Sequence, residues 1–328
     1  MSASGTVAFV AVAVLVGALH LLLVTPLEAA AGSSVRVPAA GASQELIVCG
    51  GDEVYILDLA REENGEPKKV WSWRAKDRPE LPKDSFPLGW EFNDSTECKP
   101  LDGGRKILIA CDTSGIALVD RATGRALFYA SVESAHSAEM LPGNRVAVAS
   151  SFYQGTATPR NADSLTVFDA VGPGKEVCRV AVPGGHGVVW DSGRQVLWAL
   201  SSSDIRAYRL WRWETNEPAL EMVFKVRLPE GGGHDLSPVP GSPLMMVTTG
   251  NHCWLFDQDT REFRLHPVLG EMRGVTSVSC DPATGQLAYV QAEGGNWWAE
   301  RVRFMQPDKV VHLAGERVYK ARWNTPVR

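Results

Sequence analysis

Six short apolar runs recur along the chain, and their spacing constrains the fold more than any other feature of the sequence. They are ELIVC at 45, KILIAC at 106, RVAVAS at 145, QVLWAL at 195, PLMMVT at 243 and QLAYVQ at 286. Successive runs start 39 to 61 residues apart, with turn residues and no amphipathic helix pattern between them. A period in this range is typical of β-propeller blades, each of which is built from four strands.

Further strand-like runs surround each of these six. Those that follow them are VYILD, IALVD, LTVFD, IRAYR, CWLFD and NWWAER, and an outer run follows each of these. A first run precedes five of the six units, starting at Glu97, His136, His186, His234 and Thr276. The first unit lacks one, but VYKARWN at 318–324 matches the pattern of HGVVWD at 186–191. We therefore predict an all-β, six-bladed β-propeller over 44–328, with four strands per blade and the first blade closed by the C-terminal strand, which removes exposed sheet edges.

Composition narrows the classes of protein to which the chain can belong. Hydrophobic residues make up 45% of it and charged residues 22%, as in globular proteins. The net charge is −5 and no basic run occurs, which argues against nucleic acid as a partner. The six cysteines form no C-x-x-C motif, and Cys49 and Cys111 end equivalent apolar runs. We therefore expect buried free thiols and no thiolate zinc site.

The N-terminus carries a long apolar run, VAFVAVAVLVGALHLLLV at 7–24, followed by the small residues Ala29-Ala30-Ala31-Gly32. This arrangement predicts a signal peptide over 1–31, a flexible lead-in over 32–43, and a secreted or periplasmic protein. The run is also long enough to just span a bilayer, so an uncleaved N-terminal membrane anchor remains the alternative. Beyond the leader, nothing in the sequence indicates contact with a membrane.

The paired Gly-His and strand-ending Asp residues resemble WD-repeat propellers, whose motif is a Gly-His before the first strand and a Trp-Asp after the third. The matching pairs are Gly-His at 185–186 and 233–234 and Phe-Asp at 168–169 and 256–257. WSWRAKDRPELP, ECKPLDGG, AHSAEMLPGNRVAVASS and GHDLSP further resemble a family of secreted bacterial β-propellers of unknown function, over about 45–326. The resemblance implies the fold and brings no activity with it. In WD repeats the histidine bonds to the strand-ending Asp, which implies that structural role for His186 and His234.

The first strands carry the side chains best suited to a site. In a propeller they are innermost, and they start on the face to which this chain adds its largest insertions, 76–96 and 152–163. Because long loops on a rigid scaffold commonly build sites, we expect a ligand site at that end of the central channel. The candidates are Arg78, Trp90, Glu97, Lys99, His136, Glu139, His186, His234, Asp235 and Lys320, with Phe92, Tyr153 and Trp297 as further aromatic side chains.

The chemistry of these residues leaves three functions open. The leading hypothesis is a secreted propeller that binds a polar, carbohydrate-type ligand. The second is a metal- or His-dependent lyase or hydrolase acting on a sugar, because His136, His186 and His234 could ligate a divalent metal ion and His, Lys and Glu suit acid–base work. The third is a scaffold for protein partners of the WD-repeat type. No nucleophile elbow, P-loop, dinucleotide fingerprint or H-E-x-x-H motif is present.

Overall fold

The computed structural model describes Met1 and residues 44–81, 92–152 and 162–324. The predicted leader (1–31) and lead-in (32–43) lie outside the described residues apart from Met1, as do Trp90 and Tyr153. The described part is all-β except for two single-turn 3-10 helices, η1 (Ala75–Asp77) and η2 (Asp102–Gly104). It contains no helix long and apolar enough to cross a membrane.

The described strands form six sheets, one per blade. The first blade contains β25 (Lys320–Trp323), β1 (Glu45–Gly50), β2 (Glu53–Glu63) and β3 (Glu66–Trp73), from inside to outside. The second contains β4 (Ser95–Leu101), β5 (Lys106–Cys111), β6 (Gly115–Asp120) and β7 (Ala126–Ser131), with β11 (Gly172–Pro173) added parallel to β7. The third contains β8 (Ala135–Leu141), β9 (Arg145–Ser150), β10 (Ser164–Asp169) and β12 (Lys175–Ala181).

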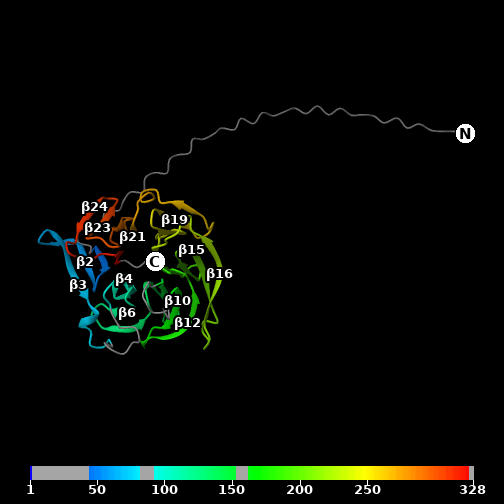
Figure 1. Cartoon of the computed structure of the whole chain (residues 1–328), viewed down its shortest axis with the longest axis horizontal. Helices are drawn as coiled ribbons and strands as arrows, with labels where there is room; N and C mark the ends of the chain where they lie inside the picture. Colours follow the sequence, from blue (N-terminus) through cyan, green and yellow to red (C-terminus); the bar gives the residue numbers. More distant parts are fainter. Residues whose placement is uncertain (2–43, 82–91, 153–161, 325–328) are drawn as a thin grey trace. The chain divides into compact units, whose positions relative to one another are not determined.

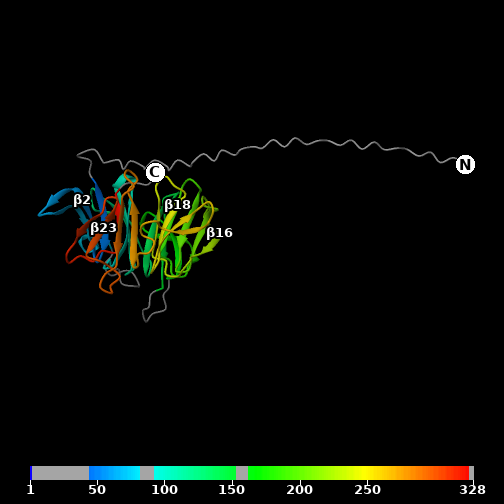
Figure 2. The ribbon, with the colours of Figure 1, turned by 90° about the horizontal axis from the view of Figure 1, so that it is seen from above.

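The remaining three blades repeat the same order. The fourth contains β13 (Gly187–Asp191), β14 (Val196–Leu200), β15 (Asp204–Trp211) and β16 (Ala219–Arg227). The fifth contains β17 (Asp235–Pro238), β18 (Leu244–Thr248), β19 (Cys253–Asp257) and β20 (Phe263–Leu265). The sixth contains β21 (Val275–Cys280), β22 (Leu287–Gln291), β23 (Arg301–Met305) and β24 (Lys309–His312). Figure 1 shows the blades in chain order around one axis, and Figure 2 shows the ring from its side.

The C-terminal strand closes the ring, as predicted. β25 pairs antiparallel with β1, with Leu46 opposite Trp323 and Cys49 opposite Lys320. This pairing gives the first blade its inner strand from the opposite end of the chain. The predicted six-bladed propeller is therefore confirmed.

The cores lie between neighbouring blades. Leu46 and Val48 of β1 pack against the sixth blade, whereas Ile47 and Cys49 pack against the second. Successive strand residues point to opposite faces of a sheet, and here both faces are buried. This is why the second strand of each blade reads as an unbroken apolar run.

The third strand of the sixth blade lies later than the sequence prediction. NWWAER, at 296–301, was predicted to be this strand, but β23 begins at Arg301. Val302 and Phe304 of β23 are buried between the sixth and first blades, whereas Trp297 is 41% exposed. RVRFM alternates between charged and apolar residues up to Phe304, as a half-buried strand requires. NWWAER is rich in aromatic residues but does not alternate in this way.

Close packing between blades explains the glycine of each Gly-His pair. A Cβ atom on Gly185 would lie 2.9 Å from the backbone oxygen of Ser150, at the end of β9 in the third blade. A Cβ atom on Gly233 would lie 2.5 Å from the backbone oxygen of Ser201, in the fourth blade. Both contacts are too short for any residue with a side chain, so each pair marks where one blade begins against the previous one.

Candidate functional site

The inner strands bring two different sets of residues together at the two ends of the ring axis. His136, His186 and His234 stand at or just before the starts of β8, β13 and β17, and their rings are in contact. The ends of β4, β8, β13, β17, β21 and β25 surround a pocket. We call these the histidine end and the pocket end of the ring.

A buried ionic cluster separates the two ends. Arg322 donates from Nε to Glu97 Oε1 over 2.9 Å and from Nη2 to Asp235 Oδ1 over 2.6 Å. Lys320, two residues earlier on β25, lies 3.1 Å from Asp235 Oδ1 and 3.6 Å from Glu97 Oε2. All four residues are at most 5% exposed. We call them the ionic plug, because they join the first, second and fifth blades across the axis.

The opposite charges of the plug stabilise one another's ionised forms. Burial alone would raise the pKa of Glu97 and Asp235, but Arg322 and Lys320 hold both pKa values below their usual range. Burial alone would lower the pKa of Lys320, which the two carboxylates instead raise. All four groups are therefore ionised at neutral pH, with a net charge of zero. A buried cluster of this kind is costly to break, because removing one member leaves an uncompensated charge.

Hydroxyl side chains connect the inner strands to one another. An inner strand has one edge without a sheet partner, so its backbone groups need other hydrogen bonds. Ser137 donates to Glu97 Oε2 over 2.8 Å and accepts from the Val188 N–H over 3.3 Å. Ser237 donates to the Val278 carbonyl over 2.7 Å. These bonds fix the inner strands around the plug.

A β-bulge positions His136. The register between β8 and β9 shifts between Ala135 and Ser137, so His136 is the extra residue. Its ring stacks on that of His186, with centroids 4.1 Å apart, and His186 meets His234 edge-on at 5.4 Å. The bulge also resets the alternation that follows, so Ser137 and Glu139 both face the interior of the ring.

The histidines do not make the WD-type bond that the resemblance implied. His186 Nδ1 lies 3.0 Å from the Gly184 carbonyl, and His136 Nε2 lies 3.4 Å from Asp112 Oδ1. The strand-ending aspartates have other partners: Asp257 accepts the N–H groups of Asp259 and Thr260 in its own turn, and Asp169 pairs with Arg145. The Asp257 turn joins the third and fourth strands of its blade, at the pocket end.

The predicted metal site receives no support from the arrangement of its three histidines. In the described ranges of the chain, no group of three or more His, Cys, Asp or Glu side chains is placed to hold a metal ion. The physical reason lies in the stack of His136 and His186, whose planes are only 15° apart. Imidazole lone pairs lie in the ring plane, so stacked rings direct them side by side and not toward one point.

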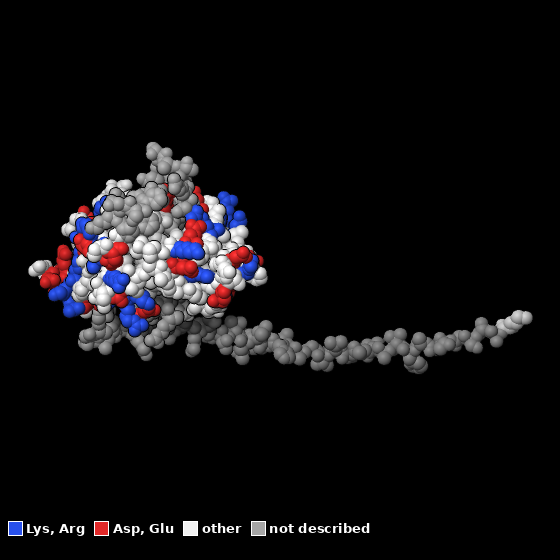
Figure 3. Space-filling view, turned by 90° about the horizontal axis from the view of Figure 1, so that it is seen from below, with Lys and Arg blue, Asp and Glu red and all other residues white. Residues whose placement is uncertain are grey.

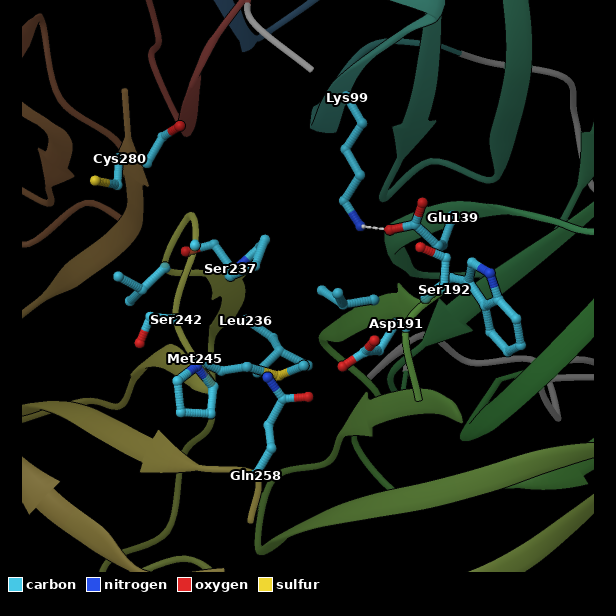
Figure 4. A pocket seen from close by; sticks show the side chains of 18 of the residues that line it. Lys99, Glu139, Asp191, Ser192, Leu236, Ser237, Ser242, Met245, Gln258 and Cys280 are labelled. Carbon is cyan, nitrogen blue, oxygen red and sulfur yellow. Dashed lines mark hydrogen bonds and ion pairs between the residues drawn. The ribbon is translucent and has the colours of Figure 1, made fainter. Parts of the chain in front are cut away.

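The pocket at the other end has a volume of about 810 Å³. Figure 4 shows its two walls: Lys99, Glu139 and Asp191 on one side, and Leu236, Met245 and Gln258 on the other. Lys99 Nζ donates to Glu139 Oε2 over 2.9 Å and also to the Val188 carbonyl. The side chains of this pair are 13% and 16% exposed, so the pocket wall contains an ion pair that is largely shielded from solvent.

The sequence matches the profile of a family of unknown function, DUF6528, over residues 58–326. The chain belongs to the DUF6528 family. No curated protein matches it. Its structure is similar to that of a putative 6-phosphogluconolactonase from Bacteroides uniformis, with a TM-score of 0.52 and 11% identity over 83% of this chain and 82% of that one. Identity this low shows a shared fold alone.

The structure places the predicted site residues of this DUF6528 propeller at three levels along the axis. His136, His186 and His234 form the histidine end; Glu97, Asp235 and Lys320 belong to the plug; Lys99 and Glu139 line the pocket. The prediction of one site at the start of the inner strands therefore combined groups that the plug separates.

Two predicted residues of the first insertion lie away from the axis. A Cβ atom on Gly124, in the turn between β6 and β7, would lie 2.8 Å from the guanidinium of Arg78, which therefore packs against the outer part of the second blade. Phe92 is buried beside Trp73 between the first two blades. Trp90 lies outside the described residues, and Trp297 packs on Tyr319.

Three residues of the central channel were not predicted from the sequence. Arg322 is two residues after Lys320, and side chains two apart on a strand lie on the same face. The sequence therefore contained the information that places Arg322 beside Lys320. Asp191 ends the first strand of its blade, a position that could have been assigned to the pocket end. Gln258 follows the strand-ending Asp257 in a turn, and nothing in the sequence distinguishes it from other polar turn residues.

Proposed function

We propose that this propeller is a binding protein for a small polar ligand of carbohydrate type, held in the pocket at the ends of the inner strands. The observation that carries the proposal is the pocket of about 810 Å³, which is lined by residues of all six blades. Small-molecule sites have volumes of about 300–1,000 Å³ and combine apolar walls with a few fixed polar groups. The pocket matches that description.

The lining of the pocket suits the two chemical characters of a sugar. Trp190 and Val239 line the pocket and are partly exposed, so they present apolar surface that can cover the C–H face of a sugar ring. Lys99, Glu139 and Asp191 also line it, where they can donate to and accept from hydroxyl groups. Because the inner strands are tied together by the plug, these groups are preorganised, and little order has to be gained on binding.

The charge distribution favours a small ligand over an extended charged polymer. On the face drawn in Figure 3, Lys and Arg side chains are interspersed with Asp and Glu side chains of the described residues. A nucleic acid or another polyanion is normally bound by a continuous basic surface. The apolar run and small residues at the N-terminus support secretion as part of the proposal, which places the ligand outside the cytoplasm.

A blocking substitution tests the proposal. Ser192 lies on the pocket rim in the turn after β13, and its side chain is exposed, so Ser192→Trp obstructs the pocket without removing an internal contact. Ser203→Trp is the matched control, because Ser203 is exposed in the turn before β15 at the other end of the same blade. We expect calorimetric titration to find a mono- or disaccharide that the parent and Ser203→Trp bind, and that Ser192→Trp binds at least tenfold more weakly. Equal binding by both variants would disprove this site.

A further inference from the structure

We propose that the ligand of the pocket is uncharged and donates a hydrogen bond to Gln258 Oε1, which makes Gln258 the residue that determines specificity. This inference rests on the proposed function, because it concerns the same pocket. It goes further in naming the ligand's charge and the atom that recognises it. Two observations carry it: an unpaired buried amide oxygen, and the complete pairing of the charges around it.

The amide oxygen of Gln258 is the unexplained polar atom of the pocket. Gln258 is 8% exposed, and its Oε1 is buried without a hydrogen-bond partner among the described residues. Its backbone N–H donates to the Pro243 carbonyl over 3.1 Å, which fixes the residue at the end of β19. Figure 4 shows the side chain extending beside Leu236 and Met245. Buried acceptors are nearly always satisfied, so this one indicates a donor supplied from the pocket.

The cations of the pocket wall are already neutralised. Lys99 pairs with Glu139 at 2.9 Å, and Arg194 pairs with Asp191 at 3.0 Å and with Asp259 at 2.6 Å. The guanidinium of Arg322 is occupied by the two carboxylates of the plug.

The remaining acid of the wall, Asp102, pairs with Lys106 at 2.7 Å. A phosphate or carboxylate on the ligand would therefore meet no unpaired cation among the described residues of the wall, and it would lie near carboxylates that repel it. An ammonium group would likewise find each carboxylate engaged. Desolvating a charge without a partner is unfavourable, so the pocket selects against both kinds of charged ligand.

The ligand class follows from these two observations. It carries a neutral donor, a hydroxyl or an amide N–H, that reaches Gln258 Oε1. It also carries apolar surface for Trp190 and Val239, which are partly exposed in the same pocket. Uncharged saccharides and related polyols meet both conditions, whereas sugar phosphates, uronic acids and amino sugars fail the first.

Calorimetric titration with matched probes tests the inference. The probes are glucose, galactose, maltose, cellobiose and lactose, set against glucose 6-phosphate, glucuronate and glucosamine. We expect the parent protein to bind at least one uncharged sugar, and to bind each charged probe at least tenfold more weakly. Tighter binding of a charged probe that Ser192→Trp abolishes would overturn the inference and leave the proposed function standing. Binding of no probe of either kind would overturn both.

Substitution of the amide gives a second, independent measurement. Gln258→Met keeps the length of the side chain and removes the acceptor, and we expect it to weaken binding of the uncharged sugar at least tenfold. Its melting temperature should equal or exceed that of the parent, because no protein hydrogen bond is lost. Gln286→Met is the matched control, since the Gln286 amide donates to the Pro307 carbonyl on the surface. Unchanged binding, or a clear fall in the melting temperature of Gln258→Met, would overturn the inference.

Discussion

At the scale of single residues, the three histidines show how burial changes a familiar side chain. Burial and Lys320 lower the pKa of His136, His186 and His234, that of His186 to about 3, and neighbouring imidazoles lower those of His136 and His186 further. The carboxylate facing the stack, Asp112, has a pKa that burial raises. The imidazoles are therefore neutral in the folded protein at physiological pH.

This lowered pKa predicts a loss of stability in mild acid. The unfolded chain takes up a proton on His186 near pH 6.5, and the folded protein does so only near pH 3. The stabilisation is therefore complete above about pH 6.5 and is lost as the pH falls toward the folded pKa. We expect His186 alone to account for about 2 kcal/mol of unfolding free energy lost between pH 7 and pH 5.

Urea unfolding at both pH values measures this loss. In His186→Asn the unfolding free energy should fall by about 2 kcal/mol less between pH 7 and pH 5 than in the parent. In His312→Asn, at an exposed position on β24, the fall should equal that of the parent. The same loss in His186→Asn as in the parent would contradict the assignment. The interval from pH 7 to pH 5 lies above the range in which the plug carboxylates titrate, so their contribution does not interfere.

At the scale of elements, β25 both closes the ring and supplies both cations of the plug. Its backbone pairs with β1, and its side chains reach Glu97 on β4 and Asp235 on β17. One four-residue strand therefore joins its own blade to two others. Closure and the separation of the two ends depend on the same element.

We expect Arg322→Met to lower the free energy of unfolding by about 3–5 kcal/mol, because it leaves two buried carboxylates with only Lys320 between them. Chemical denaturation measures the change. Arg209→Met is the control, since Arg209 and Glu221 form an exposed pair, and such pairs contribute about 1 kcal/mol or less. A loss no larger than that of the control would mean that the plug does not hold the ring.

At the scale of the whole molecule, the ring is held by packing between blades. All six cysteines lie in the described part of the chain, and none forms a disulfide. Cys49, Cys98 and Cys111 are buried in the core between the first and second blades. The sequence prediction of packed thiols agrees with this arrangement.

A thiol titration checks in solution whether all six cysteines are free thiols. Burial raises the pKa of Cys98 and Cys111 well above the usual thiol value, and that of Cys253 to about 12. Because the thiolate is the reactive form, we expect these thiols to react slowly with a thiol reagent in the native protein. In denaturant without reductant all six should react. A count of four or fewer would show a disulfide and contradict the structure.

The sequence by itself determined the architecture of this protein. Period-two patterns and turn residues mark each strand locally, so the blades and the closing strand at 318–324 could be predicted without knowledge of any contact. The sixth blade shows the limit of such local patterns. The aromatic residues of NWWAER favour a strand, but the third strand of this blade is RVRFM. The sequence also indicated which residues belong to the inner strands. It therefore predicted that Glu97, Lys99, His136 and Lys320 lie near the axis.

Only the tertiary structure decided how those residues are divided. Glu97 and Lys99 are two residues apart on one strand, a rise of roughly 7 Å, yet Glu97 pairs within the plug and Lys99 pairs with Glu139 in the pocket wall. Arg322 reaches across the axis to a strand 87 residues away, and that contact separates the histidine end from the pocket. Gln258 differs from other polar turn residues only because its buried amide oxygen has no hydrogen-bond partner among the described residues. Contacts of this kind depend on where distant strands meet, which no local pattern records.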